Sequence, residues 1–225
     1  MTSDLHYAVL TIKGESCRIV GYYPWHSDRK RIEHFIAERF NSVYGAHLHH
    51  FMPLLVALET EAGELLAVVG VRAAQTEKLF LEQYLNEPIE RVIATHLQVD
   101  GRCLDALRPN VVEVGNLAAL KPGYGRYLFA VLTDLLSAWH FRWLACTGIT
   151  GVVNALRRLG IEPRCVAPAT PERIPGGVTE WGDYYNKHPQ VMVGEIEQGR
   201  IQVERCGLLQ SCQYRRLEQT DVLSA

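Results

Sequence analysis

The chain has 225 residues, of which 48% are hydrophobic and 21% are charged, so it can bury the core of one large domain and is not expected to be disordered. Its formal net charge of −2 gives no general reason to expect a nucleic acid or an acidic membrane as partner. Because no run of roughly 18 apolar residues could span a bilayer and no secretory signal is visible, we expect a cytoplasmic protein without a transmembrane segment.

The first half of the chain predicts strands, a helix and a hairpin. Residues 5–12 and 17–23 alternate enough between apolar and polar side chains to form strands. A helix follows, which Ser27 or Asp28 can cap and Gly45 ends. Two apolar strands, MPLLVALE and ELLAVVGVR, then form a hairpin across a glycine-containing turn. LFLEQYL and PIERVIA are helical or irregular, and VDGRCLDALRPN is a turn-rich approach to the next strand.

The second half predicts a strand, a glycine turn, a helix, a strand and a second helix. EVGNLA is the central strand, Gly123 and Gly125 form the turn, and residues 126–139 carry the apolar stripe of a helix. RWLACT is a buried strand, and TGVVNALRRLG is a short helix that Gly160 ends. VMVGEI and RIQVE are expected to form a hairpin across EQGR, and the stretch from Gly207 is polar.

The cysteines and histidines give no metal signal. The six cysteines are scattered without a CxxC pair, so we interpret them as reduced thiols. The histidines of HLHH, at positions 47, 49 and 50, have mixed spacing that favours a loop between a helix and a strand over a metal site. We therefore expect no metal.

The turn at Gly123 and Gly125 is typical of a phosphate site. Glycines let backbone amides approach an anion closely, and the first turn of a helix offers free N–H groups and a positive dipole end. The same pattern also fits a glycine turn without a ligand. From Glu113 to Cys165, six basic residues stand against three acidic ones. This excess suits a phosphate-bearing ligand or an acidic carrier protein, although a solvated helix face would look similar.

The order of elements resembles the cofactor-binding half of GNAT acyltransferases. The motifs EVGNLA, LFLEQYL, VVNALRRLGI and WGDYYNKHPQV resemble the thermostable hemolysin family, which is similar in fold to GNAT enzymes and acyl-homoserine-lactone synthases. The resemblance covers about residues 25–197. It implies an α/β (α+β) fold of GNAT type: a mixed, mostly antiparallel central sheet with splayed central strands, flanked by helices. We expect one domain over 1–197, with its cofactor half at about 111–165, and a C-terminal strand and polar tail over 198–225.

The resemblance also implies which residues bind the thioester. A backbone N–H of Leu117 or Ala118 would point at the thioester carbonyl. Leu120 stands where the GNAT signature has Gln or Arg, and Lys121 can replace the lost positive charge. Asn154 resembles an asparagine that touches the cofactor arm. The pyrophosphate would be bound by Gly123, Tyr124, Gly125 and Arg126. Coenzyme A and the phosphopantetheine of an acyl carrier protein are equally expected as donors.

The central strand and its neighbour supply the polar candidates. Glu113 stands where GNAT enzymes often place a carboxylate that acts as general base through a water, and partial burial would raise its pKa. It could instead be a strand-end glutamate paired with Arg108 or Arg126. Asn116 either orients the substrate or satisfies backbone groups at a bulge. Thr147 flanks the groove as a substrate contact.

The aromatic residues of WGDYY form the other concentrated signal. Trp181, Tyr184 and Tyr185 suit the wall of an acyl tunnel, and the two tyrosines could act as general acid for the departing thiolate. They could equally form an aromatic corner that pins the late prolines to the sheet. Glu82 and Tyr84 of LFLEQYL are either substrate contacts or helix surface.

Two classes of function follow from the sequence. The favoured one is an N-acyltransferase that moves a fatty acyl group from a thioester to a small amine or amino-acid derivative. The alternative is a lytic or membrane-perturbing protein on a GNAT shell, although no basic amphipathic helix is visible. The sequence does not determine the acyl chain, the acceptor or the oligomeric state, and a homodimer stays open.

Overall fold

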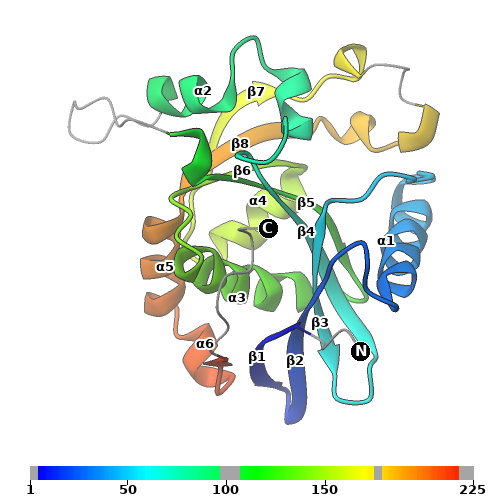
Figure 1. Cartoon of the computed structure of the whole chain (residues 1–225), viewed down its shortest axis with the longest axis vertical. Coiled ribbons are helices and arrows are strands. Elements are labelled where there is room, and N and C mark those ends of the chain that lie inside the picture. The colour runs from blue at the N-terminus through cyan, green and yellow to red at the C-terminus, as the bar shows by residue number, and fades with distance from the viewer. Residues whose placement is uncertain (1–4, 97–106, 175–178, 218–225) are drawn as a thin grey trace.

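The computed structural model describes residues 5–96, 107–174 and 179–217. Within them, a nine-stranded sheet has the order β7-β8-β6-β5-β4-β3-β2-β1-β9 (Figure 1). Its neighbouring strands pair antiparallel except β5 and β6, which pair in parallel. The strands are β1 (Leu5–Ile12), β2 (Glu15–Tyr22), β3 (Leu54–Thr60), β4 (Leu65–Ala73), β5 (Val111–Ala119), β6 (Trp143–Gly148), β7 (Arg164–Pro168), β8 (Gln190–Glu195) and β9 (Arg215–Arg216). This is the mixed, mostly antiparallel sheet that the sequence predicts.

Helices cover both faces of the sheet, with α1 and α3 on opposite sides (Figure 1). The helices are α1 (Arg29–Tyr44), α2 (Ile89–His96), α3 (Tyr124–Ala138), α4 (Thr150–Arg157), α5 (Ile196–Arg205) and α6 (Leu208–Ser211). Short 3₁₀ turns lie at Phe80–Tyr84, Arg108–Asn110, Pro171–Arg173, Thr179–Trp181 and Tyr185–Lys187. The turn Phe80–Tyr84 lies within LFLEQYL, which was expected to be helical or irregular, and it contributes residues to the cavity described below.

The alternation of side chains along β3 explains the two layers. All seven residues of this strand are buried, because both faces of the sheet are covered. Leu55 and Ala57 belong to the core beneath α1, whereas Leu54, Val56 and Leu58 belong to the core beneath α3. Each fully buried aliphatic side chain of this kind stabilises the fold by about 1.5–3 kcal/mol.

The predicted helices and hairpin are confirmed at their central residues. α1 ends at Gly45, whose φ of 64° lies in the left-handed region that glycine adopts without strain. β3 and β4 form the expected hairpin. The apolar stripe of α3 packs against the sheet, and α4 follows β6 as the sequence predicts.

The prediction of a hairpin over 191–204 is wrong, because only its first arm is a strand. The second arm is the helix α5, in which Ile196, Gly199 and Val203 are buried at helical spacing. Arg200 pairs with Glu197 and Glu204 along the exposed side of the same helix. The predicted strand in the C-terminal segment is therefore a helix, and the two-residue β9 extends the sheet beside β1. The domain boundaries stay a prediction.

The predictions for the cysteines, the histidine motif and membrane spans concern separate parts of the chain. Most of VDGRCLDALRPN lies outside the described residues, as does Cys103. The described cysteines are free thiols: Cys17, Cys146, Cys165, Cys206 and Cys212. The histidine motif lies in the irregular segment 45–53, between α1 and β3, as expected. Among the helices that the structure describes, none has the length and apolar character needed to cross a membrane.

Candidate active site

A cavity lies where β5 and β6 separate. The parallel ladder between them begins with the pair Val111 and Trp143 and ends with Val114 and Cys146, although both strands continue beyond that point. A cavity of about 480 Å³ is lined by residues of both strands past the last pair, including Asn116 and Thr147. The splayed central strands that the sequence predicts therefore create a space at the middle of the sheet.

The cavity reaches both faces of the sheet through this split. Val114 and Cys146 belong to the core on the α3 side, and both line the cavity. Ala145 belongs to the core on the α1 side, so its register partner Glu113 and the alternate residue Thr147 face that side too. The polar walls of the cavity are thus on the α1 side of the split.

Glu113 is the buried carboxylate of this site, with 2% of its surface exposed. Its Oε2 accepts a hydrogen bond from Phe80 N at 2.8 Å, and its Oε1 accepts one from Leu81 N at 2.9 Å. Burial raises the pKa of Glu113 to about 6, although the two backbone N–H groups and Arg72 act in the opposite direction. The carboxylate can therefore exchange a proton near neutral pH.

The ion pair that the sequence left open for Glu113 is not formed with Arg108. Arg108 instead donates to Glu82 and Glu90, at 2.8 Å and 3.0 Å respectively. Glu82 also accepts from the backbone N–H groups of Leu79 and Ile89. Although burial acts to raise it, Arg108 and these amides hold the pKa of Glu82 below its ordinary value. Glu82 lies outside the cavity lining, and its oxygens are occupied by structural partners.

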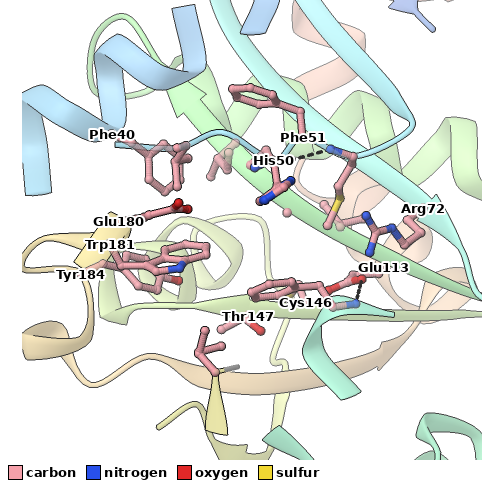
Figure 2. A pocket seen from close by; sticks show the side chains of 18 of the residues that line it. Phe40, His50, Phe51, Arg72, Glu113, Cys146, Thr147, Glu180, Trp181 and Tyr184 are labelled. Carbon is pink, nitrogen blue, oxygen red and sulfur yellow. Dashed lines mark hydrogen bonds between the residues drawn. The ribbon is translucent and has the colours of Figure 1, made fainter. Parts of the chain in front are cut away.

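Arg72 lies opposite Glu113 on the neighbouring strand, β4. The two residues are register partners in β4 and β5, and both line the cavity. Figure 2 shows them at one end of the cavity, with Trp181 and Tyr184 on the opposite wall. Arg72 was missed by the sequence analysis, although a single cation inside the apolar run ELLAVVGVR was the signal that could have revealed it.

The aromatic residues of WGDYY form a packed corner that also supplies part of the cavity wall. Trp181 and Tyr184 line the cavity, whereas Tyr185 lies behind its wall. The Tyr185 hydroxyl is 2.6 Å from that of Tyr84, which does line the cavity. Burial raises the pKa of all three tyrosines. The 3₁₀ turn before α2 thus adds Tyr84 to the aromatic wall.

The same aromatic segment is anchored to the end of α1. Asp183 N donates to Tyr44 O at 2.7 Å, and His47 N donates to Glu180 O at 2.7 Å. Between these bonds, Gly182 has a φ of 50°, and a Cβ there would clash with the Tyr44 carbonyl. Only glycine fits this close approach. The segment is thus an aromatic corner and a cavity wall at once.

Asn116 occupies a bulge in β5. Its φ is 48°, and the pairing with β4 shifts register between Val68 and Gly70. The Asn116 Oδ1 accepts a hydrogen bond from Met52 N at 3.0 Å. Of the two roles considered for Asn116, this geometry supports the structural one, because its side-chain amide holds the loop 46–53 against the sheet. This loop brings Leu48, His49, His50, Phe51 and Met52 to the cavity, and the sequence analysis missed them as site residues.

The glycine turn lies beyond the cavity, at the start of α3. Gly123 is the N-cap residue with a φ of 102°, and a Cβ on Gly123 would meet no atom within 4 Å. A Cβ on Gly125 would meet only Leu117 Cδ1, at 4.0 Å. The positions that these two Cβ atoms would occupy are therefore open. The N–H groups of Tyr124 and Arg126 bond back within the turn, at 3.4 Å and 3.1 Å.

The remaining candidates for cofactor binding are spread around this turn. Leu117 lines the cavity, whereas Ala118 is buried in the ladder opposite Val68. Lys121 and Asn154 are exposed, the latter on α4. The Arg126 guanidinium lies over the ring of Tyr127, 5.7 Å from its centroid. The structure places Leu117 alone of these candidates in the cavity wall.

No metal site accompanies this cavity in the described residues. No three His, Cys, Asp or Glu side chains come together there in an arrangement that could hold a metal ion. The polar side chains of the lining include the carboxylate of Glu113, the guanidinium of Arg72 and the hydroxyl groups of Tyr84 and Thr147.

Several solved structures share the fold of this chain. The N-acyl amino acid synthase FeeM from uncultured soil microbes superposes with a TM-score of 0.54 at 14% identity, over 84% of this chain and 97% of its own. The coenzyme A-dependent acyl-homoserine lactone synthase BjaI, solved with SAM and isopentyl-CoA, gives 0.53 at 10% identity, over 89% and 90%. The AHL synthase LasI gives 0.52 at 10% identity, over 81% and 91%. At these identities the likeness shows the fold, and the predicted fold class is confirmed.

Comparison by sequence identifies the family. No curated protein matches the chain. The family model described as thermostable hemolysin matches residues 22–200, which is most of the chain and includes the whole cavity wall from the loop 46–53 to Tyr184. The chain therefore belongs to the thermostable hemolysin family.

Proposed function

We propose that this protein is an N-acyltransferase, which moves an acyl group from a thioester to a small amine. The observation that carries the proposal is Glu113, a buried carboxylate with a raised pKa that borders the cavity where β5 and β6 separate. A pKa of about 6 leaves the group mostly ionised at pH 7 and still able to accept a proton, as a general base requires.

The donor would lie along the separated part of β5. Beyond Val114 this strand has no partner on the β6 side, so its backbone is available to the arm of a thioester. Gly123 and Gly125 leave open space before the first turn of α3, which supports a pyrophosphate or phosphate position there. A backbone N–H near Leu117 would then donate to the oxyanion that develops on the thioester carbonyl.

The reaction needs one proton to move. The amine nitrogen attacks the thioester carbonyl carbon, a C–N bond forms, and the C–S bond breaks to release a thiolate. Glu113 would accept the amine proton, directly or through a water, and the thiolate would finally receive a proton. Tyr84 lines the cavity, its hydroxyl lies 2.6 Å from that of Tyr185, and we propose that it hydrogen-bonds the departing sulfur.

The aromatic wall favours an apolar acyl chain. Phe40, Phe80, Trp181 and Tyr184 all line the cavity, and such rings bury large apolar surfaces. Both coenzyme A and an acyl carrier protein remain donors in this proposal, because the open glycine turn fits the phosphate of either. BjaI, one of the structural relatives, was solved with isopentyl-CoA.

Mass spectrometry of reaction products tests the proposal. The purified protein is incubated with acyl-CoA and acyl carrier protein panels and mixed amines, and N-acyl products and free thiol are measured. Glu113→Gln should lose activity by about 10²–10⁴-fold, the usual contribution of a general base. The matched control is Glu15→Gln, an exposed residue of β2 away from the cavity. Unchanged rates in Glu113→Gln would contradict the role of this residue.

The family description supports a second candidate, a protein that lyses membranes directly. Dye release from pure lipid vesicles, without any thioester, separates the two functions. Release by the purified protein at levels equal to those with thioester and amine present would support direct lysis. Release only after the thioester and amine are supplied would instead assign the lytic effect to an acylated product.

A further inference from the structure

Arg72 is the only lysine or arginine among the described residues that line the cavity. Its side chain is 17% exposed, so much of its charge is removed from water. Its Nε lies 3.3 Å from Glu77 Oε1, but the Nε is buried without a hydrogen bond in the described structure. The side chain of Glu77 is itself 44% exposed, and an ion pair at that exposure contributes little.

Three arginines, Arg39, Arg72 and Arg126, have a buried Nε without a hydrogen bond in the described structure, and of these Arg72 alone lines the cavity. Two other enclosed arginines, Arg29 and Arg108, are saturated with partners. Arg29 donates to the carbonyls of Tyr22, Met52 and Pro53 and to the Glu33 carboxylate. Arg108 donates to two carboxylates and two carbonyls. Arg72 makes no such hydrogen bond to any residue that the structure describes. Because its ion-pair partner among the described residues is the partly exposed Glu77, the Arg72 guanidinium keeps N–H donors for a partner that is supplied from outside the chain.

Glu113 does not supply that partner, although it is the register partner of Arg72. Its two oxygens accept from the backbone of the 3₁₀ turn at Phe80–Tyr84 instead. The cavity thus presents an unsaturated cation beside a carboxylate that exchanges protons near neutral pH. Residues directly opposite on antiparallel strands hold their Cβ atoms about 4.5–5.5 Å apart. The two side chains therefore start from neighbouring positions on one face of the sheet, where a small ligand that carries both an anion and an amine could contact both.

We propose that the acceptor is an α-amino acid, whose carboxylate is bound by the Arg72 guanidinium while its amine faces Glu113. The planar guanidinium suits a carboxylate because two parallel N–H groups can donate to its two oxygens. This arrangement fixes the amine beside the base. The inference rests on the proposed function, since it names the class of amine that the same site acylates.

A binding experiment without any donor tests this inference independently of catalysis. Calorimetry is performed with apolar and aromatic amino acids, with their methyl esters, and with the corresponding decarboxylated amines. The ester and the decarboxylated amine keep the ammonium group but lack the carboxylate. We expect the amino acid to bind at least about tenfold more tightly than either analogue, since a lost charge-assisted pair has about that effect.

Variants of Arg72 test whether this residue causes the preference for the amino acid over its ester and its decarboxylated amine. Arg72→Gln should weaken binding of the amino acid about tenfold or more and leave binding of the ester unchanged. Arg72→Lys keeps the charge but loses the bidentate geometry, so it should retain part of the preference. Arg200→Gln, on the exposed side of α5, is the matched control and should keep it all. A circular dichroism spectrum equal to that of the parent protein confirms folding of each variant.

The outcomes separate this inference from the proposed function. Amino acid binding that depends on Arg72, without any acyl transfer from the donor panels, would uphold the amino acid site at Arg72 and reject the transferase. Acyl transfer to esters and decarboxylated amines as fast as to amino acids would reject the acceptor class and keep the transferase. Equal affinity of Arg72→Gln and the parent protein for the amino acid would also overturn the inference, as would no binding of any amino acid.

Discussion

The pKa of Glu113 predicts a specific pH dependence of stability. In the folded chain this pKa is raised to about 6 from an ordinary value of 4.5, mainly by burial. Below pH 4.5 the group is protonated in both the folded and unfolded states and has no effect on the free energy of unfolding. As the pH rises through 6, the folded state must hold a carboxylate that the unfolded state accommodates more easily. Stability present at low pH is therefore lost as the pH rises.

The size of this effect follows from the shift. One pKa unit corresponds to about 1.4 kcal/mol, so a shift of about 1.5 units corresponds to about 2 kcal/mol. Glu113→Gln removes the titration. The variant also replaces one carboxylate oxygen with an NH2 group, which leaves Phe80 N or Leu81 N facing a donor and costs about 1–3 kcal/mol at every pH. The absolute stabilities do not isolate the ionisation, but their pH dependence does.

Urea unfolding of both proteins between pH 4 and pH 8 measures this dependence. The free energy of unfolding of the parent protein should fall by about 2 kcal/mol relative to that of Glu113→Gln over this range, and most of the change should occur between pH 4.5 and pH 7. Glu15→Gln, at an exposed position, should follow the parent protein. Parallel curves for the parent protein and Glu113→Gln would refute the argument, because they would mean that burial does not perturb this carboxylate.

Three further predictions concern the backbone around the cavity. Gly182→Ala should lower the free energy of unfolding by at least about 2 kcal/mol in urea titration, because its Cβ would clash with the Tyr44 carbonyl. Gly63→Ala, at a positive φ with open space around it, should lower it by only about 1 kcal/mol. Equal losses would contradict the close approach of Gly182 to the end of α1. Asn116→Ala should lower the free energy of unfolding by about 1–3 kcal/mol, because Met52 N loses its acceptor. Asn116→Gly should lower it by less, because glycine adopts the φ of 48° without strain. The reverse order would show that the backbone conformation is unimportant. Gly125→Leu should abolish binding of acyl-CoA in calorimetry with folding intact, and unchanged affinity would remove the phosphate site.

Local pattern was enough to predict the regular elements of the fold. The stripe of α3 and the hairpin of β3 and β4 depend on spacing within one segment, which the sequence displays directly. The prediction for residues 196–205 was wrong because IEQGRIQVE contains alternating apolar residues over part of its length, which were interpreted as the second strand of a hairpin. Its charged pairs at spacings of three and four residues were the better signal for a helix.

The site was harder to predict because its groups meet only through long-range contacts. Tyr185 was identified from the WGDYY motif, yet it lies outside the cavity lining, and its hydroxyl bonds to that of Tyr84, a lining residue 101 residues earlier. Arg72 and Glu113 are brought opposite one another by the register of β4 and β5, which a bulge shifts. No local pattern specifies a register that depends on a bulge, so a sequence can indicate each group without indicating that they meet.

The loop 46–53 shows how glycines without a positive φ also shape the site. Gly70 and Gly115 are register partners in β4 and β5, and a Cβ on Gly70 would lie 2.8 Å from Met52 Cβ. The absence of two side chains at this point of the sheet leaves a flat area on which Met52 packs. The Met52 N–H then donates to Asn116 Oδ1 at 3.0 Å, and the preceding residues of the loop line the cavity. The bulge that redirects β5 and the loop that closes the space are thus fixed by one contact, so perturbing this contact should alter the positions of the donor strand and the cavity roof together.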